Sequence, residues 1–172
     1  MVCAEIVDPS DARSFTGAVQ YREATSMDVP AMERCRAADH AAGPADARVS
    51  AYLEGHHHPQ QALAPRVAFV ALHGADVVGY IAGHATTRYE CDGEVQYLYV
   101  APGHRRSGVA GQLLRRLTDW FGRQSIRRVC VNADVASAGA VPFYTAYGAR
   151  PLNRYWFIWD DMRATLSGIP RH

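Results

Sequence analysis

Two periods of hydrophobic residues divide the chain near residue 100. Before that point, apolar residues come in short runs or alternate with polar ones, and this pattern predicts strands over residues 67–72, 77–87 and 94–100. The segments 73–76 and 90–93 between them are polar and turn-like. Because such short connections join neighbouring strands, we expect an antiparallel meander.

After residue 100 the apolar residues recur every three or four positions, which is the period of a helix that packs on a core. The polar residues between them would face the solvent. The pattern therefore predicts an amphipathic helix whose apolar stripe consists of Val109, Leu113, Leu117, Trp120 and Phe121.

The rest of the chain carries shorter signals. Thr25 and Asp28 have the spacing of a capping box, which opens a helix that we expect to continue to about residue 39. No repeat or linker divides the 172 residues, so we expect one domain over residues 18–162, between an N-terminal extension (1–17) and a C-terminal tail (163–172). Further elements are expected at residues 19–24 (strand), 45–53 (helix), 55–65 (loop), 129–133 (strand), 138–147 (helix) and 156–160 (strand).

Composition narrows the classes of function. The formal net charge is only +1, so the molecule as a whole does not attract polyanions, and we expect no nucleic-acid partner. The N-terminal residues lack the pattern of a signal peptide, and no stretch approaches the roughly 18 apolar residues of a membrane helix. We therefore expect a cytoplasmic protein without a membrane partner.

Metal binding is not expected either. The four cysteines are far apart in the sequence and form no CxxC pair, which favours free thiols over a metal cluster. In the tract His56-His57-His58, three adjacent loop residues cannot all point at one ion.

The segment between the last meander strand and the amphipathic helix carries the chemistry. Amides at a helix N-terminus lack intrahelical partners and carry partial positive charge, so they bind phosphate. Small residues at positions 107, 108, 110 and 111 would let an anion approach this backbone, and Arg105 and Arg106 add charged donors. The segment predicts a pyrophosphate site.

Spacing excludes two common phosphate-binding motifs. Gly103 and Gly108 are separated as in a Walker A motif, but Val109 and Ala110 stand where Lys and Ser or Thr are required. The dinucleotide pattern G-x-G-x-x-G is absent, and it would need a parallel βαβ unit where we expect antiparallel strands.

Two sequence patterns are more specific. The loop reads Arg105-Arg106-Ser107-Gly108-Val109-Ala110, of the form Q/R-x-x-G-x-G/A, and the pattern V-x-P-x-x-R precedes it from Val100 to Arg105. A second segment, from Ala140 to Gly148, has the form A-x-x-F-Y-x-x-x-G. The first pattern resembles the acetyl-CoA signature, and the second resembles another motif, of the GNAT superfamily of N-acetyltransferases. Both lie in the order and at the separation that the family uses, and the resemblance covers residues 18–162.

The resemblance implies an α/β fold of GNAT type, in which helices flank both faces of a mixed, mostly antiparallel sheet. It also implies acetyl-CoA as co-substrate, with the pantetheine arm on the strand backbone and the pyrophosphate on the loop amides. Many members of the family have Asn at the cofactor contact where this chain has Ser137. The implied cofactor-binding residues are Leu98, Tyr99, Val100, Arg105, Arg106, Ser107, Gly108, Val109, Ala110, Gly111, Ser137 and Tyr144.

Two catalytic residues follow from the same resemblance. Tyr144 would lie near the thioester sulfur, where the family often uses a tyrosine as general acid. Glu94, eleven residues before Arg105, matches the glutamate that histone-acetylating members use as general base. From the residues alone, Glu94 could equally be solvated or paired with Arg88.

The surroundings of these residues also carry expectations. On a helix, Phe143 and Tyr147 share one face, which we expect to be in the core, whereas Tyr144 lies about 100° away and is free to face elsewhere. His84 and His104 have the titration range of proton shuttles, but we expect them to be exposed polar residues.

The implied activity is the transfer of an acetyl group from acetyl-CoA to a primary amine, directly and within a ternary complex. The acceptor is left open between a small molecule such as an aminoglycoside or a polyamine and a peptide amine. The alternative is a non-catalytic acyl-CoA-binding regulatory module. A homodimer is also left open.

Overall fold

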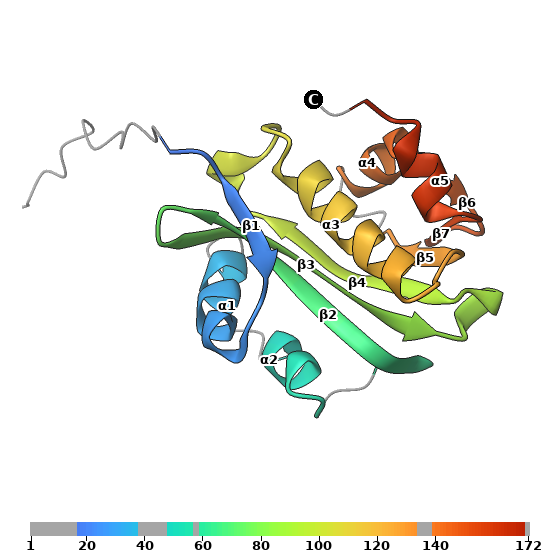
Figure 1. Cartoon of the computed structure of the whole chain (residues 1–172), viewed down its shortest axis with the longest axis horizontal. Helices are drawn as coiled ribbons and strands as arrows, with labels where there is room; N and C mark the ends of the chain where they lie inside the picture. Colours follow the sequence, from blue (N-terminus) through green and yellow to red (C-terminus); the bar gives the residue numbers. More distant parts are fainter. Residues whose placement is uncertain (1–16, 38–47, 57–58, 134–138, 171–172) are drawn as a thin grey trace, which may run out of the picture.

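The computed structural model describes residues 17–37, 48–56, 59–133 and 139–170. Within these residues, strands and helices form one α/β unit (Figure 1). The strands are β1 Gln20–Glu23, β2 Ala62–His73, β3 Asp76–Thr86, β4 Gly93–Val100, β5 Val129–Asn132, β6 Arg150–Pro151 and β7 Trp156–Trp159. The helices are α1 Val29–Ala37, α2 Arg48–Leu53, α3 Val109–Arg123, α4 Ala140–Ala146 and α5 Met162–Ser167, with 3₁₀ turns η1 Ser26–Asp28, η2 Arg88–Glu90 and η3 Pro102–His104.

The described strands form one sheet in the order β1-β2-β3-β4-β5-β7-β6. From β1 to β4, each strand pairs antiparallel with the next one in the chain, which confirms the predicted meander. Only β4 and β5 among the described strands run parallel, and α3 forms the crossover between them. The remaining pairs, β5 with β7 and β7 with β6, are antiparallel. The predicted mixed, mostly antiparallel sheet is confirmed.

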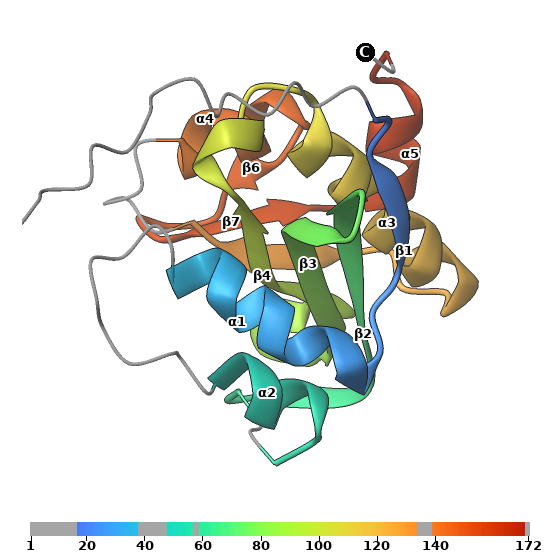
Figure 2. The same ribbon diagram turned by 90° about the vertical axis from the view of Figure 1, so that its left-hand side faces the viewer.

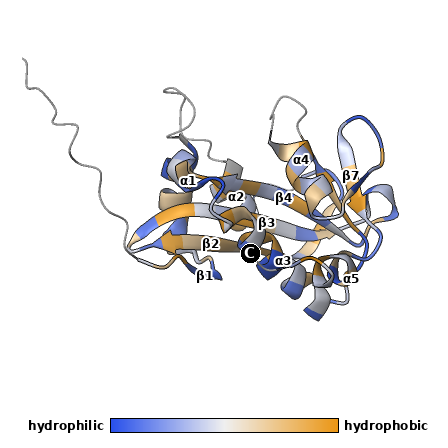
Figure 3. Cartoon of the chain, turned by 90° about the horizontal axis from the view of Figure 1, so that it is seen from above, coloured by the Kyte–Doolittle hydropathy of each residue, from blue (hydrophilic) through white to orange (hydrophobic). Residues whose placement is uncertain are grey.

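Helices cover both faces of this sheet. Helices α1 and α2 lie on one face, and α3 and α5 lie on the opposite face (Figure 2). Seen from above, the colour of hydrophobic residues follows the strands between the two helical layers, while hydrophilic colour marks the outer side of α3 and α5 (Figure 3). Strand residues point alternately to the two layers. Tyr97 and Tyr99 pack with the α1/α2 cluster, and Val100 packs with α3. Val95 also packs with α3, because an extra residue at position 96 shifts the alternation.

Helix α3 contributes the centre of the larger core. Its predicted apolar stripe is buried, and Leu113, Leu114 and Leu117 are fully enclosed between the helix and the sheet. Burying one such side chain stabilises the fold by about 1.5–3 kcal/mol. This packing fixes the N-terminal end of α3 next to the end of β4.

The start of the first helix is encoded locally, as predicted. The Asp28 carboxylate accepts a hydrogen bond from the Thr25 backbone N–H at 2.8 Å. It also accepts two from Arg22, at 2.7 Å each. The hydrogen-bonded Arg22 guanidinium, with smaller contributions from Thr25, holds the pKa of Asp28 well below its usual range.

Three elements differ from the sequence prediction. Strand β2 begins at Ala62, inside the segment expected to be loop, because β3 provides it with partners as far as Thr86. Strand β6 has only two residues, too few to produce a period. Helix α5 begins at the end of the predicted domain and continues into the predicted tail. Asp161 caps it through a hydrogen bond from the Ala164 N–H at 2.9 Å, and it buries Met162 and Leu166.

No helix in the described part of the chain is long and apolar enough to cross a bilayer.

Candidate active site

The sheet opens between β4 and β5. These strands pair only over Gly93–Val95 and residues 129–131. Beyond Val95, the described residues give β4 no strand partner on the β5 side, although β3 continues to pair with it as far as Val100. An unpaired strand edge presents amide and carbonyl groups that an extended ligand can bind like an added strand. Leu98, Tyr99 and Val100, predicted to bind the pantetheine arm, all lie on this stretch.

A bulge marks the point where the two strands separate. Val95 pairs with Gly83 and Tyr97 pairs with Ala82, so Gln96 is an extra residue of β4. The side-chain oxygen of Gln96 is buried and has no hydrogen-bond partner among the described residues. A buried acceptor without a partner is costly, so this oxygen is suited to a donor from a ligand.

The predicted phosphate loop follows directly. Arg106 has φ 63° and Gly108 has φ 84°, and Gly108 is the residue from which α3 starts. Residues 105–108 are exposed, whereas Val109 is buried and anchors the first turn of the helix. The first amides of α3 therefore face an open loop, as a phosphate site requires.

Arg105 contacts the end of β4 in this structure. Its Nε donates a hydrogen bond to the Val100 carbonyl at 2.9 Å, and its guanidinium lies over the Tyr99 ring, 5.7 Å from the centroid. The side chain thus ties the loop to the end of β4. Ser107 closes the turn with a hydrogen bond to the His104 carbonyl at 2.6 Å.

Gly111 is required by helix packing. A Cβ atom at this position would lie 1.9 Å from the Tyr147 hydroxyl oxygen, which rests against the α3 backbone. The carbonyl of Tyr147 in turn accepts a hydrogen bond from the Trp159 indole at 2.8 Å. The absence of a side chain at Gly111 therefore lets the end of α4 pack beside the phosphate loop.

The expected orientation of the α4 aromatic residues is wrong. Tyr144 is buried, with its ring centroid 5.2 Å from that of Phe143 and 5.9 Å from that of Trp159. Phe143 and Tyr147, expected in the core, are only half-buried. Burial raises the pKa of Tyr144 well above its usual value, so the phenol keeps its proton at neutral pH.

Glu94 lies in a buried polar cluster, and it is not solvated. Its side chain is 5% exposed, and its Oε2 accepts a hydrogen bond from Arg88 Nε at 3.0 Å. The pairing with Arg88 that the sequence left open is therefore present. Arg88 also stacks on the Trp156 ring, 4.6 Å from the centroid.

The histidine expectations are corrected in part. His84 is completely buried, contrary to expectation, and its Nε2 is 3.7 Å from Glu94 Oε2. Its Nδ1 is 2.9 Å from the Tyr52 hydroxyl. His104 is half-buried beside His73, with 3.5 Å between their ring nitrogens. Sequence reasoning missed Tyr52 and misplaced His84 because their proximity to Glu94 depends on long-range pairing.

Three residues discussed in the sequence analysis lie outside the described residues: His57, His58 and Ser137. Among the residues that are described, no group of three or more His, Cys, Asp or Glu side chains is placed to hold a metal ion.

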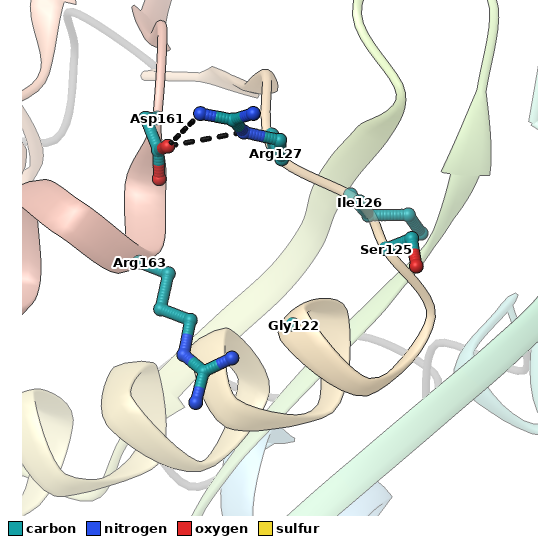
Figure 4. A pocket seen from close by; sticks show the side chains of 6 residues that line it. All are labelled: Gly122, Ser125, Ile126, Arg127, Asp161 and Arg163. Atoms are coloured by element: carbon teal, nitrogen blue, oxygen red, sulfur yellow. Dashed lines mark hydrogen bonds and ion pairs between the residues drawn. The ribbon is translucent and has the colours of Figure 1, made fainter.

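A second surface depression lies at the other end of α3, where Arg127 pairs with Asp161 at 2.7 Å (Figure 4). The 15 residues of α3 separate it from the phosphate loop by about 22 Å at 1.5 Å per residue. It is therefore separate from the site at β4. Its lining residues are Gly122, Ser125, Ile126, Arg127, Asp161 and Arg163.

Comparison with solved structures agrees with this geometry. An acetyltransferase of the GNAT family from Staphylococcus aureus Mu50 is 14% identical with a TM-score of 0.65, over 82% of this chain and 98% of that one. Arabidopsis thaliana NAA60 in complex with acetyl-CoA is 12% identical with a TM-score of 0.62, over 83% of this chain and 98% of that one. The aminoglycoside acetyltransferase meta-AAC0020 from an uncultured soil metagenomic sample is 17% identical with a TM-score of 0.59, over 80% and 94%. At these identities the likeness shows the fold.

Sequence comparison supplies the family. A comparison with curated proteins gives no match. The model of the Acetyltransferase (GNAT) family matches residues 34–149, which is more than half of the chain and includes the open edge of β4, the phosphate loop and α4. The chain belongs to the GNAT family of acetyltransferases.

Proposed function

We propose that this acetyltransferase moves the acetyl group of acetyl-CoA to a primary amine by direct transfer, with both substrates bound at the open edge of β4. The observation that carries the proposal is the continuity of two features. The strand edge that β5 leaves open at Val95 leads directly to the exposed loop where α3 begins at Gly108.

The residues present fit a CoA thioester. Its pantetheine arm carries amides, and the backbone of Leu98, Tyr99 and Val100 offers amide and carbonyl groups on an unpaired edge. The buried Gln96 oxygen adds an acceptor that lacks a partner among the described residues. The loop from Arg105 to Gly111 would hold the pyrophosphate with its amides. When bound, acetyl-CoA supplies an acyl group activated as a thioester.

The proton transfers are assigned to two residues. An amine with a pKa of about 10.4 is mostly ammonium at neutral pH, so a base must remove a proton before the nitrogen can attack. Glu94 is the proposed base, directly or through a water molecule. Tyr144 is the proposed acid, on the resemblance of residues 140–148 to the family motif; burial raises the pKa of its hydroxyl, which therefore carries a proton at neutral pH.

The acceptor is proposed as a primary amine of either a small molecule or a peptide. Structural neighbours include an aminoglycoside acetyltransferase and a plant NAA60 bound to a bisubstrate analogue, and both share the fold with this chain. Glu94 faces the α1/α2 side of the sheet, as does His84 opposite it. The acceptor amine is therefore proposed to approach from that side.

The test is a thiol-release assay with acetyl-CoA and a panel of aminoglycosides, polyamines and peptides with free N-termini. Release of CoA that depends on one class of amine, with a product that is heavier by one acetyl group, supports the proposal. Calorimetric binding of acetyl-CoA without turnover on any class would support a regulatory module instead. Absence of binding would contradict both.

A further inference from the structure

The buried cluster around Glu94 is built from three neighbouring strands and one helix. Arg66 of β2 pairs with His84 of β3, and His84 pairs with Glu94 of β4, so the three side chains form a row on one face of the sheet. Helix α2 covers this row with Tyr52. Cys130 of β5 stands next to Glu94 on the other side.

His84 is the least satisfied member of this row. Its Nδ1 is within hydrogen-bond distance of the Tyr52 hydroxyl, at 2.9 Å. Its Nε2 is buried and has no hydrogen-bond partner among the described residues. The group facing Nε2 is Glu94 Oε2 at 3.7 Å, which is too long for a hydrogen bond but close enough for a strong electrostatic interaction.

These contacts decide which nitrogen carries the proton in the neutral ring. If Nδ1 were protonated, the bare lone pair of Nε2 would face the Glu94 carboxylate across 3.7 Å, and the two acceptors would repel each other. If Nε2 is protonated, its N–H points at the carboxylate and Nδ1 accepts the Tyr52 hydroxyl. Burial raises the pKa of Tyr52 far above its usual value, so this hydroxyl has a proton to donate.

Two arginines make contacts within this row. Arg66 lies over the Tyr52 ring, 4.9 Å from the centroid, and donates to the Tyr52 carbonyl at 2.7 Å. Arg88 Nε donates a hydrogen bond to Glu94 Oε2 at 3.0 Å. The charged groups next to His84 are therefore two guanidinium groups and the carboxylate of Glu94.

Both contacts of Glu94 use the same oxygen. Arg88 and His84 approach Oε2, and the described residues give Oε1 no hydrogen bond. A carboxylate fixed through one oxygen presents the other in a defined direction. Such an arrangement is how outer contacts orient a reacting group.

We propose that His84 is a positioning residue for Glu94: Tyr52 fixes its tautomer, and its Nε2–H holds Oε2 so that Oε1 faces the acceptor amine. This inference rests on the proposed role of Glu94 as base. It predicts a chemical state of His84 that exists whether or not an amine is turned over.

The first experiment measures that state in the full chain. Long-range ¹H–¹⁵N correlation spectra of histidine-labelled protein at pH 7, with the His84 signals assigned by their loss in His84→Asn, should show a proton on Nε2 and none on Nδ1. In Tyr52→Phe the donor to Nδ1 is gone, so the population of this tautomer should fall. A matched control is Tyr80→Phe. Tyr80 is an equally buried tyrosine of the hydrophobic cluster that also contains Tyr52, and its substitution should leave His84 unchanged.

The second experiment reads the effect on Glu94. With an amine identified in the thiol-release assay, Tyr52→Phe should lower kcat/KM by up to about a hundredfold, the loss that slight misplacement of a reacting group produces. The loss should appear in kcat, with the KM for acetyl-CoA unchanged, because a misplaced base affects the chemical step while the phosphate loop is untouched. Tyr80→Phe should keep the kinetic constants of the parent.

The outcomes separate the two proposals. A proton on Nδ1 of His84, or a charged ring at pH 7, overturns the inference even if the enzyme is active. Tyr52→Phe spectra and kinetic constants that match those of Tyr80→Phe overturn it as well. If the tautomer is as expected but Glu94→Gln retains full activity, the role of Glu94 as base is contradicted, and with it the positioning role.

Discussion

The predicted phosphate loop and the Glu94 cluster, the two halves of the proposed site, are built in opposite ways. The loop is a continuous segment between β4 and α3, exposed to solvent, and it offers mainly backbone groups. The cluster takes one side chain from each of several elements and buries them, and its contacts depend on the register between β2, β3 and β4. Substitutions in the loop should therefore act on binding, and substitutions in the cluster should act on the chemical step.

The largest effect is expected in the cluster. Glu94→Gln keeps the shape of the side chain but removes the base, so kcat/KM in the thiol-release assay should fall by about 10²–10⁴. Affinity for acetyl-CoA, measured by calorimetry, should stay close to that of the parent because the loop is unchanged. Glu90→Gln is the control, since Glu90 lies nearby with its side chain 92% exposed. Equal losses in both variants would remove the distinction between the buried and the exposed carboxylate.

Tyr144→Phe tests the other proposed proton transfer. The substitution removes only the hydroxyl from a ring that packs against Phe143 and Trp159, so the fold should be retained. If the hydroxyl protonates the departing sulfur, kcat should fall by about two orders of magnitude with little change in acetyl-CoA affinity. The control is Tyr147→Phe.

Unchanged kcat in Tyr144→Phe would make Tyr144 a packing residue. A loss of acetyl-CoA affinity together with kcat would instead make the hydroxyl a binding contact. A larger loss of kcat in Tyr147→Phe than in Tyr144→Phe would contradict the assignment of the acid, because the hydroxyl of Tyr147 rests on Gly111 at the phosphate loop.

The loop should respond through affinity. Gly108 has φ 84°, a conformation that costs a residue with a side chain about 1–2 kcal/mol. Gly108→Leu should relieve this strain by moving the first amides of α3, so the Kd for acetyl-CoA should rise by about tenfold or more. Gly103→Leu is a matched control in the same segment, because a Cβ atom there would meet nothing within 4 Å. Similar Kd values for the two variants would show that the loop amides do not bind the cofactor.

This contrast explains how much of the molecule could be predicted from its sequence. The phosphate loop, the apolar stripe of α3 and the meander were predicted because each depends on neighbouring residues or on a simple period. The Glu94 cluster was not predicted from the sequence, because the connection between β3 and β4 is an irregular turn in which Tyr89 and Glu90 both have positive φ. With a tight turn at residues 90–93, His84 would not pair with Glu94 as it does.

Helix α4 shows a second limit of the sequence pattern. Phe143 and Tyr144 lie within this seven-residue helix and Tyr147 is its C-cap, but helical angle alone does not say which side meets the core. That choice is made by Trp159, whose ring packs on Tyr144 and whose indole binds the Tyr147 carbonyl. Both contacts are long-range, so the buried and the half-buried tyrosine were exchanged in the prediction.

The smallest effect is expected outside the site, on the stability of the locally encoded start of α1. Asp28 has a pKa that is lower in the folded chain than in the unfolded chain, mainly because of its hydrogen bonds from Arg22. Such a group stabilises the fold above its unfolded pKa of about 3.9, and this contribution is lost as the pH falls toward the lower folded pKa. Asp28→Asn should therefore be less stable than the parent by about 1 kcal/mol at pH 7, a typical value for a lost helix cap.

The difference in the free energy of unfolding between the parent and Asp28→Asn should narrow once the pH falls below about 4. The parent then loses the stabilisation from the Asp28 charge, which the variant lacks at every pH. Urea unfolding midpoints at pH 7 and at pH 3 measure it. Asp76→Asn serves as the control, since Asp76 is exposed at the start of β3. A difference that stays constant with pH would mean that the Asp28 charge does not stabilise the start of α1, and that the capping geometry acts through its shape alone.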